Sequence, residues 1–179
     1  MIRKLLINIV VGNNPYNIKK EADDMNKYFQ LKHEYKNSLI KYRLFKILYI
    51  RKHRKIFRNY ACDITQGCKL GKVVFRHPIG IIIGGGADLK DGVIIHQNVT
   101  FGALRFDSKE RRGIFCRQIV DEDTIICTGA KILGDVTIGK NCIIGANAIV
   151  TKDVPDNTVV IGYNKHLINK NHRNGCSYE

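Results

Sequence analysis

The chain lacks several features that would define other classes of protein. Its 179 residues include only three prolines, and its apolar runs are far shorter than a membrane span, which needs roughly twenty residues. Its six cysteines, at positions 62, 68, 116, 127, 142 and 176, contain no Cys-x-x-Cys pair. These absences argue against a disordered chain, a membrane-spanning protein and a zinc- or disulfide-stapled fold. We expect reduced thiols and no metal.

No secretory cleavage site is evident near the start of the chain. Residues 1–11 combine a basic beginning with a short apolar stretch, but no small-residue cleavage motif follows before Asn13. We therefore interpret this stretch as part of the folded protein and expect the protein in the cytoplasm. The length and the 44% of hydrophobic residues predict one domain with a continuous core and a small appendage.

Acidic residues are scarce in the first third of the chain. Residues 1–60 hold fifteen Lys or Arg and four acids, whereas residues 61–179 hold fifteen and twelve, and no acid lies between Glu34 and Asp63. Apolar residues at spacings of three and four predict a helix over 38–59, and an acid-rich start predicts another over about 18–36. We expect 1–60 to be a basic, mainly helical region.

Two interpretations of the basic helix 38–59 stay open. It is either a solvated helix packed on the end of the domain, or a basic amphipathic surface that approaches anionic lipid at the inner face of the membrane or a lipid-linked glycan acceptor. Nucleic acid would suit the same charge, but no nucleic-acid motif or aromatic stacking platform accompanies it. We therefore expect no nucleic-acid partner.

Apolar residues recur every six positions in the second half of the chain. The repeating residues are Ile126, Ile132, Ile138, Ile144 and Val150, and small or short residues stand four places after each of them, at Ala130, Val136, Cys142, Ala148 and Val154. A helix does not repeat every six residues, but a triangular coil of short strands does. Residues eighteen apart, such as Ile126 and Ile144, would stack roughly 4.8 Å apart along the axis. The repeat predicts a parallel β-helix, and an isoleucine-rich sandwich is disfavoured because a period of two is missing.

An earlier register extends the coils toward the N-terminus. Its members are Ile64, Leu70, Phe75, Ile81, Ala87, Val93 and Val99, with a five-residue step from Leu70 to Phe75. Gly139, Asn141, Gly145 and Asn147 fall in corners, where a left-handed backbone is least costly for Gly and then Asn. We predict coils over 61–162, a protruding loop over 102–118 that could reach a neighbouring subunit, and a loose C-terminal extension over 163–179.

The coils carry residues suited to acyl transfer to a hydroxyl. Such a transfer needs a base for the hydroxyl proton, a group that orients the base, and donors for the oxyanion. His77 and His96 are the histidines of the coils, and Asp63 begins the first coil, fourteen residues before His77. The two could meet if the chain bends around a corner.

Four glycine-containing segments follow one another over residues 61–162: Cys62-Asp-Ile-Thr-Gln-Gly-Cys-Lys-Leu-Gly71, Arg76-His-Pro-Ile-Gly-Ile-Ile-Ile-Gly84, Ile95-His-Gln-Asn-Val-Thr-Phe-Gly102 and Gly129-Ala-Lys-Ile-Leu-Gly-Asp-Val-Thr-Ile-Gly139. They resemble successive motifs of the serine acetyltransferase family of hexapeptide acyltransferases. The resemblance implies left-handed coils, a homotrimer and acetyl-CoA as co-substrate. It also implies His77 as the catalytic base and Asp63 as its orienting partner.

The same resemblance assigns the coenzyme site. It places the backbone donor near the thioester at Gly102 and Ala103, the edge along which coenzyme A lies at Thr128 and Ala146, and a contact with its phosphates at Lys152. Simpler interpretations stay open for the two histidines: His77 as a corner residue that caps a carbonyl, and His96 as a residue at a coil or trimer contact.

Departures from the family pattern direct the prediction of the acceptor. Arg76 stands where the amino-acid enzymes place an aspartate, and an Arg-His-Pro segment is replaced by Phe115-Cys-Arg117. These features, with a short N-terminal region, resemble the branch associated with capsule, colanic acid and other surface polysaccharides. We therefore expect O-acetylation of a sugar hydroxyl, with Arg76, His96 and Cys116 at the acceptor and free serine a poor substrate.

Two other functions remain open. One is serine O-acetylation in cysteine biosynthesis, and the other is a non-catalytic β-helix that serves as an assembly or partner-binding subunit. Acetylation of free serine distinguishes the first from the sugar reaction, and failure to bind acetyl-CoA would favour the second.

Overall fold

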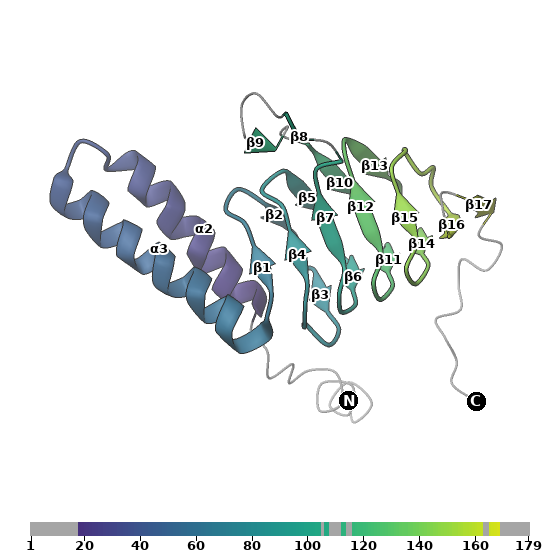
Figure 1. Ribbon diagram of the computed structural model, residues 1–179, viewed down its shortest axis with the longest axis horizontal. Helices are drawn as coiled ribbons and strands as arrows, with labels where there is room; N and C mark the ends of the chain where they lie inside the picture. The colour runs from purple at the N-terminus through teal and green to yellow at the C-terminus, as the bar shows by residue number, and fades with distance from the viewer. Residues whose placement is uncertain (1–17, 105, 108–111, 114–115, 163–164, 169–179) are drawn as a thin grey trace, which may run out of the picture.

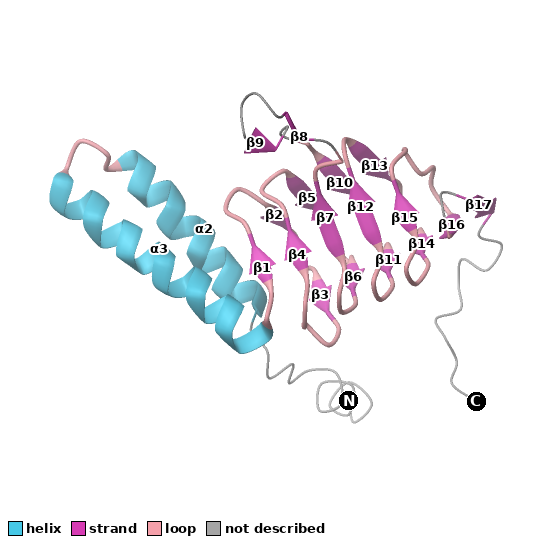
Figure 2. Cartoon of the chain, viewed as in Figure 1, coloured by secondary structure: helices cyan, strands magenta, loops and turns pink. Residues whose placement is uncertain are grey.

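A pair of antiparallel helices leads into a stack of triangular coils. The computed structural model describes residues 18–104, 106–107, 112–113, 116–162 and 165–168. Helices α2 (Ile18–Glu34) and α3 (Leu39–Tyr60) form a hairpin that meets the coils at the end where β1 lies. The short strands then follow one another along the axis toward β16 and β17 at the opposite end, joined by loops at the corners (Figures 1 and 2).

Three parallel sheets form the sides of the coil stack. Sheet A contains β1 (Asp63–Ile64), β4 (Ile82–Ile83), β7 (Thr100–Gly102), β12 (Lys131–Leu133) and β15 (Ile149–Val150). Sheet B contains β2 (Lys69–Leu70), β5 (Ala87–Leu89), β10 (Gln118–Val120) and β13 (Val136–Ile138). Sheet C contains β3 (Val74–Phe75), β6 (Ile94–Ile95), β11 (Ile125–Ile126), β14 (Ile143–Ile144) and β16 (Thr158–Ile161), and the antiparallel β17 (Lys165–Ile168) extends it. The fold is a left-handed parallel β-helix, as predicted.

The six-residue repeat lines the core with apolar side chains. Ile126 pairs with Ile144 on sheet C, and Ile132 pairs with Val150 on sheet A. Both pairs, like Ile138 on sheet B, are completely buried. The stacking of residues eighteen apart is therefore confirmed for these coils.

The predicted register of the first coils differs from the observed register by two residues. The residues in register with Ile64 and Leu70 are Ile83 and Leu89, not Ile81 and Ala87. Ile81 and Ala87 are also buried, but Ile81 lies in the row that Ala130 and Ala148 occupy in later coils, and Ala87 is in register with Gln118 and Val136. Both rows are apolar here, so a period of six could not show which one begins a strand.

The corners use asparagine and aspartate for the left-handed backbone. Asn141 and Asn147 have φ values of 53° and 56°, as predicted, whereas Gly139 and Gly145 do not have positive φ. Gly139 is needed for space instead, because a Cβ there would lie 2.2 Å from Asp156 Oδ1. Small size and left-handed conformation are thus separate demands at Gly139 and Asn141, whereas Gly92 and Gly129 meet both, with φ values of 79° and 71° and no room for a Cβ.

The helical hairpin is anchored to the first coil. Ile18, Ala22 and Met25 of α2 and Ile56 of α3 are buried against the coil stack and each other. Asn26 donates through Nδ2 to the carbonyl of Cys68 at 2.9 Å, which ties α2 to the first coil. Within the described ranges, neither helix has the apolar length that crossing a membrane requires.

The protruding loop and the C-terminal extension, both predicted to lie outside the repeat, contain residues that form short antiparallel strand pairs. The loop after β7 carries β8 (Phe106–Asp107) paired with β9 (Arg112–Gly113), and it projects beside β10 (Figure 1). In the predicted C-terminal extension, residues 165–168 fold back on β16 instead of trailing away. The expectations for residues 1–17 and 169–179 lie outside the described residues.

Candidate active site

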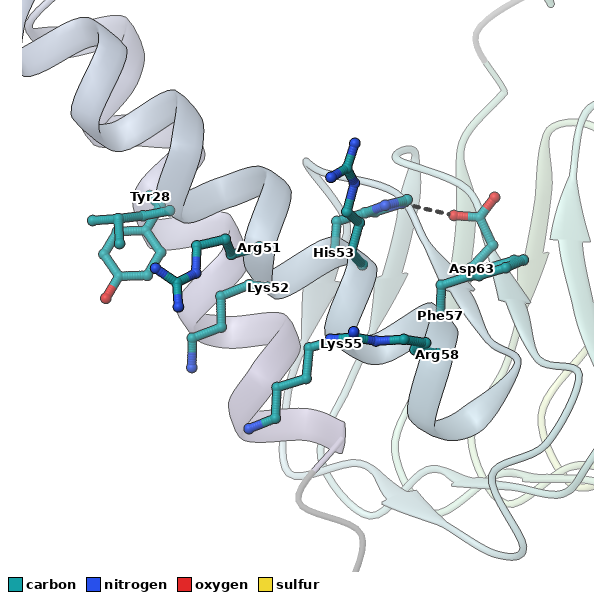
Figure 3. Close-up of a pocket in the computed structure, with 10 residues that line it drawn as sticks. Tyr28, Arg51, Lys52, His53, Lys55, Phe57, Arg58 and Asp63 are labelled. Carbon is teal, nitrogen blue, oxygen red and sulfur yellow. Dashed lines mark hydrogen bonds and ion pairs between the residues drawn. The ribbon is translucent and has the colours of Figure 1, made fainter.

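The C-terminal part of α3 places His53 beside the first strand, β1. Ala61 adopts a left-handed conformation, with φ 49°, that ends the helix and turns the chain into β1. Asp63 then faces back toward the helix, and its Oδ1 lies 3.1 Å from Nε2 of His53 (Figure 3). An ionised carboxylate only accepts hydrogen bonds, so His53 is the donor in this pair. The described residues contain no hydrogen bond between Asp63 and His77.

His77 lies in an enlarged corner between sheets C and A. The step from Phe75 to Ile83 spans eight residues instead of six, and His77 takes a left-handed conformation within it, with φ 50°. Its carbonyl accepts the backbone N–H of Ile79 at 2.7 Å, which closes a tight turn. The imidazole is exposed at this corner and is open to a substrate.

Arg76, His77 and His96 gather at the same corner. Arg76 donates its backbone N–H to the carbonyl of Ile95 at 2.7 Å, which sets it in register with His96 on the next coil. Burial, and then the charges of Arg76 and His77, lower the pKa of His96 below its ordinary value of 6.5. His96 therefore favours its neutral form at neutral pH.

The corner between sheets C and A, which we call the C–A edge, also carries two predicted coenzyme contacts. His77, Gln97, Thr128 and Ala146 each stand two positions after the inward residue of a sheet C strand. Thr128 donates through Oγ1 to the carbonyl of Gln97 at 3.2 Å, and Ala146 is exposed one coil further on. Thr128 and Ala146 thus lie in one column with His77.

The other predicted coenzyme residues lie on the opposite border of sheet A, the A–B edge. Gly102 and Ala103 follow Phe101 where the long loop leaves sheet A, and Lys152 follows Val150 two coils along. Cys116 packs there too, because a Cβ at Gly86 would come within 2.0 Å of its carbonyl oxygen. One chain therefore divides the predicted site between two edges and does not bring all of it together.

A wide cavity of about 960 Å³ borders the His53–Asp63 pair. Its walls come mainly from α3 and are strongly basic, with Arg51, Arg54 and Arg58 beside the aromatic rings of Tyr28 and Phe57. Figure 3 shows Asp63 and His53 facing each other, with Arg51 and Lys52 pointing away from this pair. Asp63 is thus the one acidic residue among the cavity-lining residues that the structure describes.

His53 is the residue that sequence reasoning missed. It lies in the basic helix, outside the repeats, where its spacing relative to Asp63 carried no signal of contact. The turn at Ala61, which brings the two together, is encoded by neither a glycine nor an asparagine. Within the described ranges, no three His, Cys, Asp or Glu side chains are grouped to hold a metal.

Comparison with known proteins agrees with the coil geometry. Residues 119–152 match the family of bacterial transferase hexapeptide repeats. The chain is 36% identical over 110 residues to a serine acetyltransferase of Bacillus pumilus, covering 61% of this chain and 48% of the relative. It is 34% identical over 112 residues to one of Staphylococcus epidermidis, covering 62% and 50%.

Solved serine acetyltransferases share the fold. The soybean enzyme in complex with serine superposes with a TM-score of 0.60 at 28% identity, over 72% of this chain and 51% of that one. The Vibrio cholerae enzyme gives a TM-score of 0.66 at 25% identity, over 81% and 50%. The coils thus define a hexapeptide-repeat protein.

More particularly, its coils are similar to those of serine acetyltransferases among hexapeptide-repeat proteins. The chain spans about half the length of the curated relatives it matches. These findings overturn the expectation of a sugar acceptor in surface-polysaccharide synthesis, because the matched relatives are serine acetyltransferases. The departures at Arg76 and at residues 115–117 are compatible with an amino-acid acceptor, since a cation at an acceptor site suits the carboxylate of an amino acid as well as a sugar.

Proposed function

We propose that this chain is an acetyl-CoA-dependent O-acetyltransferase whose acceptor is the hydroxyl of free serine. The observation that carries the proposal is the similarity to serine acetyltransferases over 110 residues, together with the position of His77, Thr128 and Ala146 on one edge of the coils. A solved serine acetyltransferase in complex with CoA, at 27% identity and a TM-score of 0.59, supports acetyl-CoA as the co-substrate. We assign the activity to residues 61–162.

The proposed reaction is a direct transfer at the C–A edge. His77 removes the proton from the serine hydroxyl as its oxygen attacks the thioester carbonyl carbon. Backbone N–H groups at Gly102 and Ala103, on the A–B edge of a neighbouring subunit, stabilise the oxyanion. The C–S bond then breaks, and the acetyl group stays on the serine oxygen. His77 gives its proton to the sulfur, so that coenzyme A leaves as a thiol.

Arg76 takes a different role in this proposal from the one expected for a sugar. Its exposed guanidinium lies beside His77 and His96, and it can form two parallel hydrogen bonds with the carboxylate of serine. His96, largely neutral, completes the acceptor side of the site, with Cys116 from the A–B edge. The acceptor is thus held by its carboxylate.

We further propose that the site is completed in a homotrimer. The outer face of sheet C is a ladder of β-branched apolar residues, formed by Val74, Ile94, Ile125, Ile143 and Val159. The outer faces of sheets A and B are mixed instead, because Lys131 and Asp88 stand in register with Ile149 and Ile119, and among the described strands only sheet C carries an unbroken apolar ladder. A second copy packed on sheet C would place its own residues beside the C–A edge.

Contact between helix 38–59 and anionic lipid is a separate proposal about partners. The exposed apolar side chains of Ile40, Leu44 and Ile47 lie on one stripe of α3, with exposed fractions of 82%, 51% and 55%. Arg51, Arg54 and Arg58 continue the same stripe, and none of them has an acidic partner among the described residues. This combination is typical of helices that lie at a charged membrane surface.

Thiol release from acetyl-CoA tests the proposed function. We expect release that depends on L-serine and is lost in His77→Ala, with much slower release for sugars and for serine amide, which lacks the carboxylate. Faster turnover on a sugar than on serine would contradict the proposal. Failure of the protein to bind acetyl-CoA would favour a non-catalytic assembly subunit instead.

A further inference from the structure

The Asp63 carboxylate has a partner outside the coils. Its Oδ1 accepts a hydrogen bond from Nε2 of His53 on α3, while its Oδ2 makes no hydrogen bond with any described residue. A carboxylate has two oxygens and room for several donors. The contact with His53 therefore leaves Oδ2 available to the imidazole of a second histidine.

The surroundings hold His53 in place. The ring of Tyr49, one helical turn earlier, lies 6.2 Å from the His53 ring at 32°. The Tyr49 hydroxyl donates to Oε1 of Gln66 in the first coil, and burial followed by the Asp63 charge raises its pKa, so that the phenol stays a donor.

Ion pairs fix the same stretch of helix on its other side. Lys52 and Lys55 contact Glu21 of α2 at 2.8 Å and 2.7 Å. His53 thus lies on a stretch of helix whose neighbours on both sides are tied to other elements, which fixes the position of its backbone relative to Asp63.

We propose that His53 is a positioning residue that fixes the Asp63 carboxylate so that its free oxygen orients His77. This inference rests on the proposed function, in which His77 is the base. The donated hydrogen bond to an ionised group holds one rotamer of Asp63, and a fixed carboxylate in turn selects the tautomer and direction of the base. The helical hairpin then contributes directly to the reaction geometry.

Substitution of His53 tests this role. His53→Ala should lower kcat about 10- to 100-fold, because a hydrogen bond to a charged group is lost, while KM for both substrates changes little. His53→Gln keeps an N–H donor and should recover most of the lost turnover. His33→Ala is the matched control, because His33 is an exposed imidazole on α2 that packs against Phe29 at 4.6 Å and takes no part in the site.

A double-mutant cycle with Asp63→Asn separates positioning from general damage to the fold. If His53 acts through Asp63, His53→Ala should cost little further kcat in the Asp63→Asn background. Unchanged kcat in His53→Ala, losses that multiply fully in the double variant, or no recovery in His53→Gln would overturn the assignment while leaving serine acetylation standing. A wild-type protein inactive on serine would overturn the proposed function and this assignment together.

Discussion

His77 combines exposure, an unusual backbone and a charged neighbourhood in a single residue. It is exposed at the enlarged corner of the first coil, and Arg76 and His96 share that corner. A base must reach its substrate, so exposure at a corner suits it better than burial in the core would. The role of His77 remains a prediction; one substitution at this position tests that role, and another tests the strain of its backbone.

The first test concerns turnover. His77→Ala should lose roughly two to four orders of magnitude in kcat while coenzyme A still binds, because general base catalysis contributes about that much. Asp63→Asn should lose less, since it affects only orientation and the stabilisation of the imidazolium. Steady-state kinetics with a calorimetric measurement of coenzyme binding would show both effects. Retained turnover in His77→Ala together with loss in His96→Ala would transfer the role to His96.

The second test concerns stability. The φ of 50° at His77 lies in the left-handed region, where a side chain with Cβ costs about 1 kcal/mol or more. His77→Gly should therefore have a higher free energy of unfolding than His77→Ala by about 1 kcal/mol, since both remove the imidazole and only glycine avoids the Cβ penalty. Urea unfolding of the pair measures the difference. An alanine variant at least as stable as the glycine variant would argue against a strained corner.

The pKa of His96 reports on its two charged neighbours. Burial lowers this pKa first, and Arg76 and His77 lower it further. We expect Arg76→Gln to raise the pKa of His96 toward 6.5, as measured by NMR titration of the imidazole. An unchanged pKa would mean that Arg76 does not face His96 in solution.

The same shift has a consequence for stability. Folded His96 binds its proton less readily than the unfolded chain does, so the unfolded state takes up more protons as the pH falls below 6.5. The contribution of neutral His96 to stability is thus fully present above that pH and declines as the pH falls toward the lowered pKa. In His96→Gln this part of the pH dependence should disappear from the free energy of unfolding.

At the scale of elements, the repeat could be predicted from the sequence wherever only one row of apolar residues is large. Over residues 126–154 the inward row is Ile or Val and the row before each strand is mostly small, so the register was unambiguous. In the first coils Ile81 and Ile83 are both large and both buried, and the prediction took the wrong one. Period alone cannot separate two apolar rows two residues apart.

The helices could be placed within a residue or two, but their contacts could not. The predicted helices 18–36 and 38–59 correspond to Ile18–Glu34 and Leu39–Tyr60. Whether His53 or His77 contacts Asp63 depends on the angle at which the chain passes from α3 into the first coil. The left-handed turn at Ala61 sets this angle. Such a turn at alanine has no local sequence signal, so the candidate site was only partly accessible to sequence reasoning.

The exposed stripe of α3 leads to a prediction about this helix alone. We expect the protein to float with vesicles that contain phosphatidylserine but not with vesicles of phosphatidylcholine alone, and less so at high salt. The double change Ile40→Asp and Leu44→Asp should abolish flotation, because it removes both apolar area and positive potential. Leu104→Asp, at a side chain 48% exposed in the loop after β7, is the control. If the double variant floats as well as the wild type, α3 does not mediate vesicle binding and is a solvated helix.

At the scale of the whole molecule, the two edges of sheet A raise a question of assembly. His77, Thr128 and Ala146 lie on the C–A edge, whereas Gly102, Ala103 and Lys152 lie on the A–B edge. A sheet separates the edges within one chain, so one molecule of coenzyme A that contacts both sets would have to lie between two subunits. The apolar ladder on sheet C supplies a surface on which those subunits could meet.

Disruption of that ladder should therefore abolish assembly and activity together. Ile143 is half-buried on the outer face of sheet C, between Ile125 and Val159, and Ile143→Glu would bury a charge in the interface at a cost of several kcal/mol. We expect light scattering to show a trimer for the wild type and a monomer for the variant, with circular dichroism unchanged and turnover largely lost. Thr137→Glu, at an exposed position on the outer face of sheet B, should remain trimeric and active. A monomeric variant with full turnover would contradict active sites shared between subunits and would leave each chain to complete its site alone.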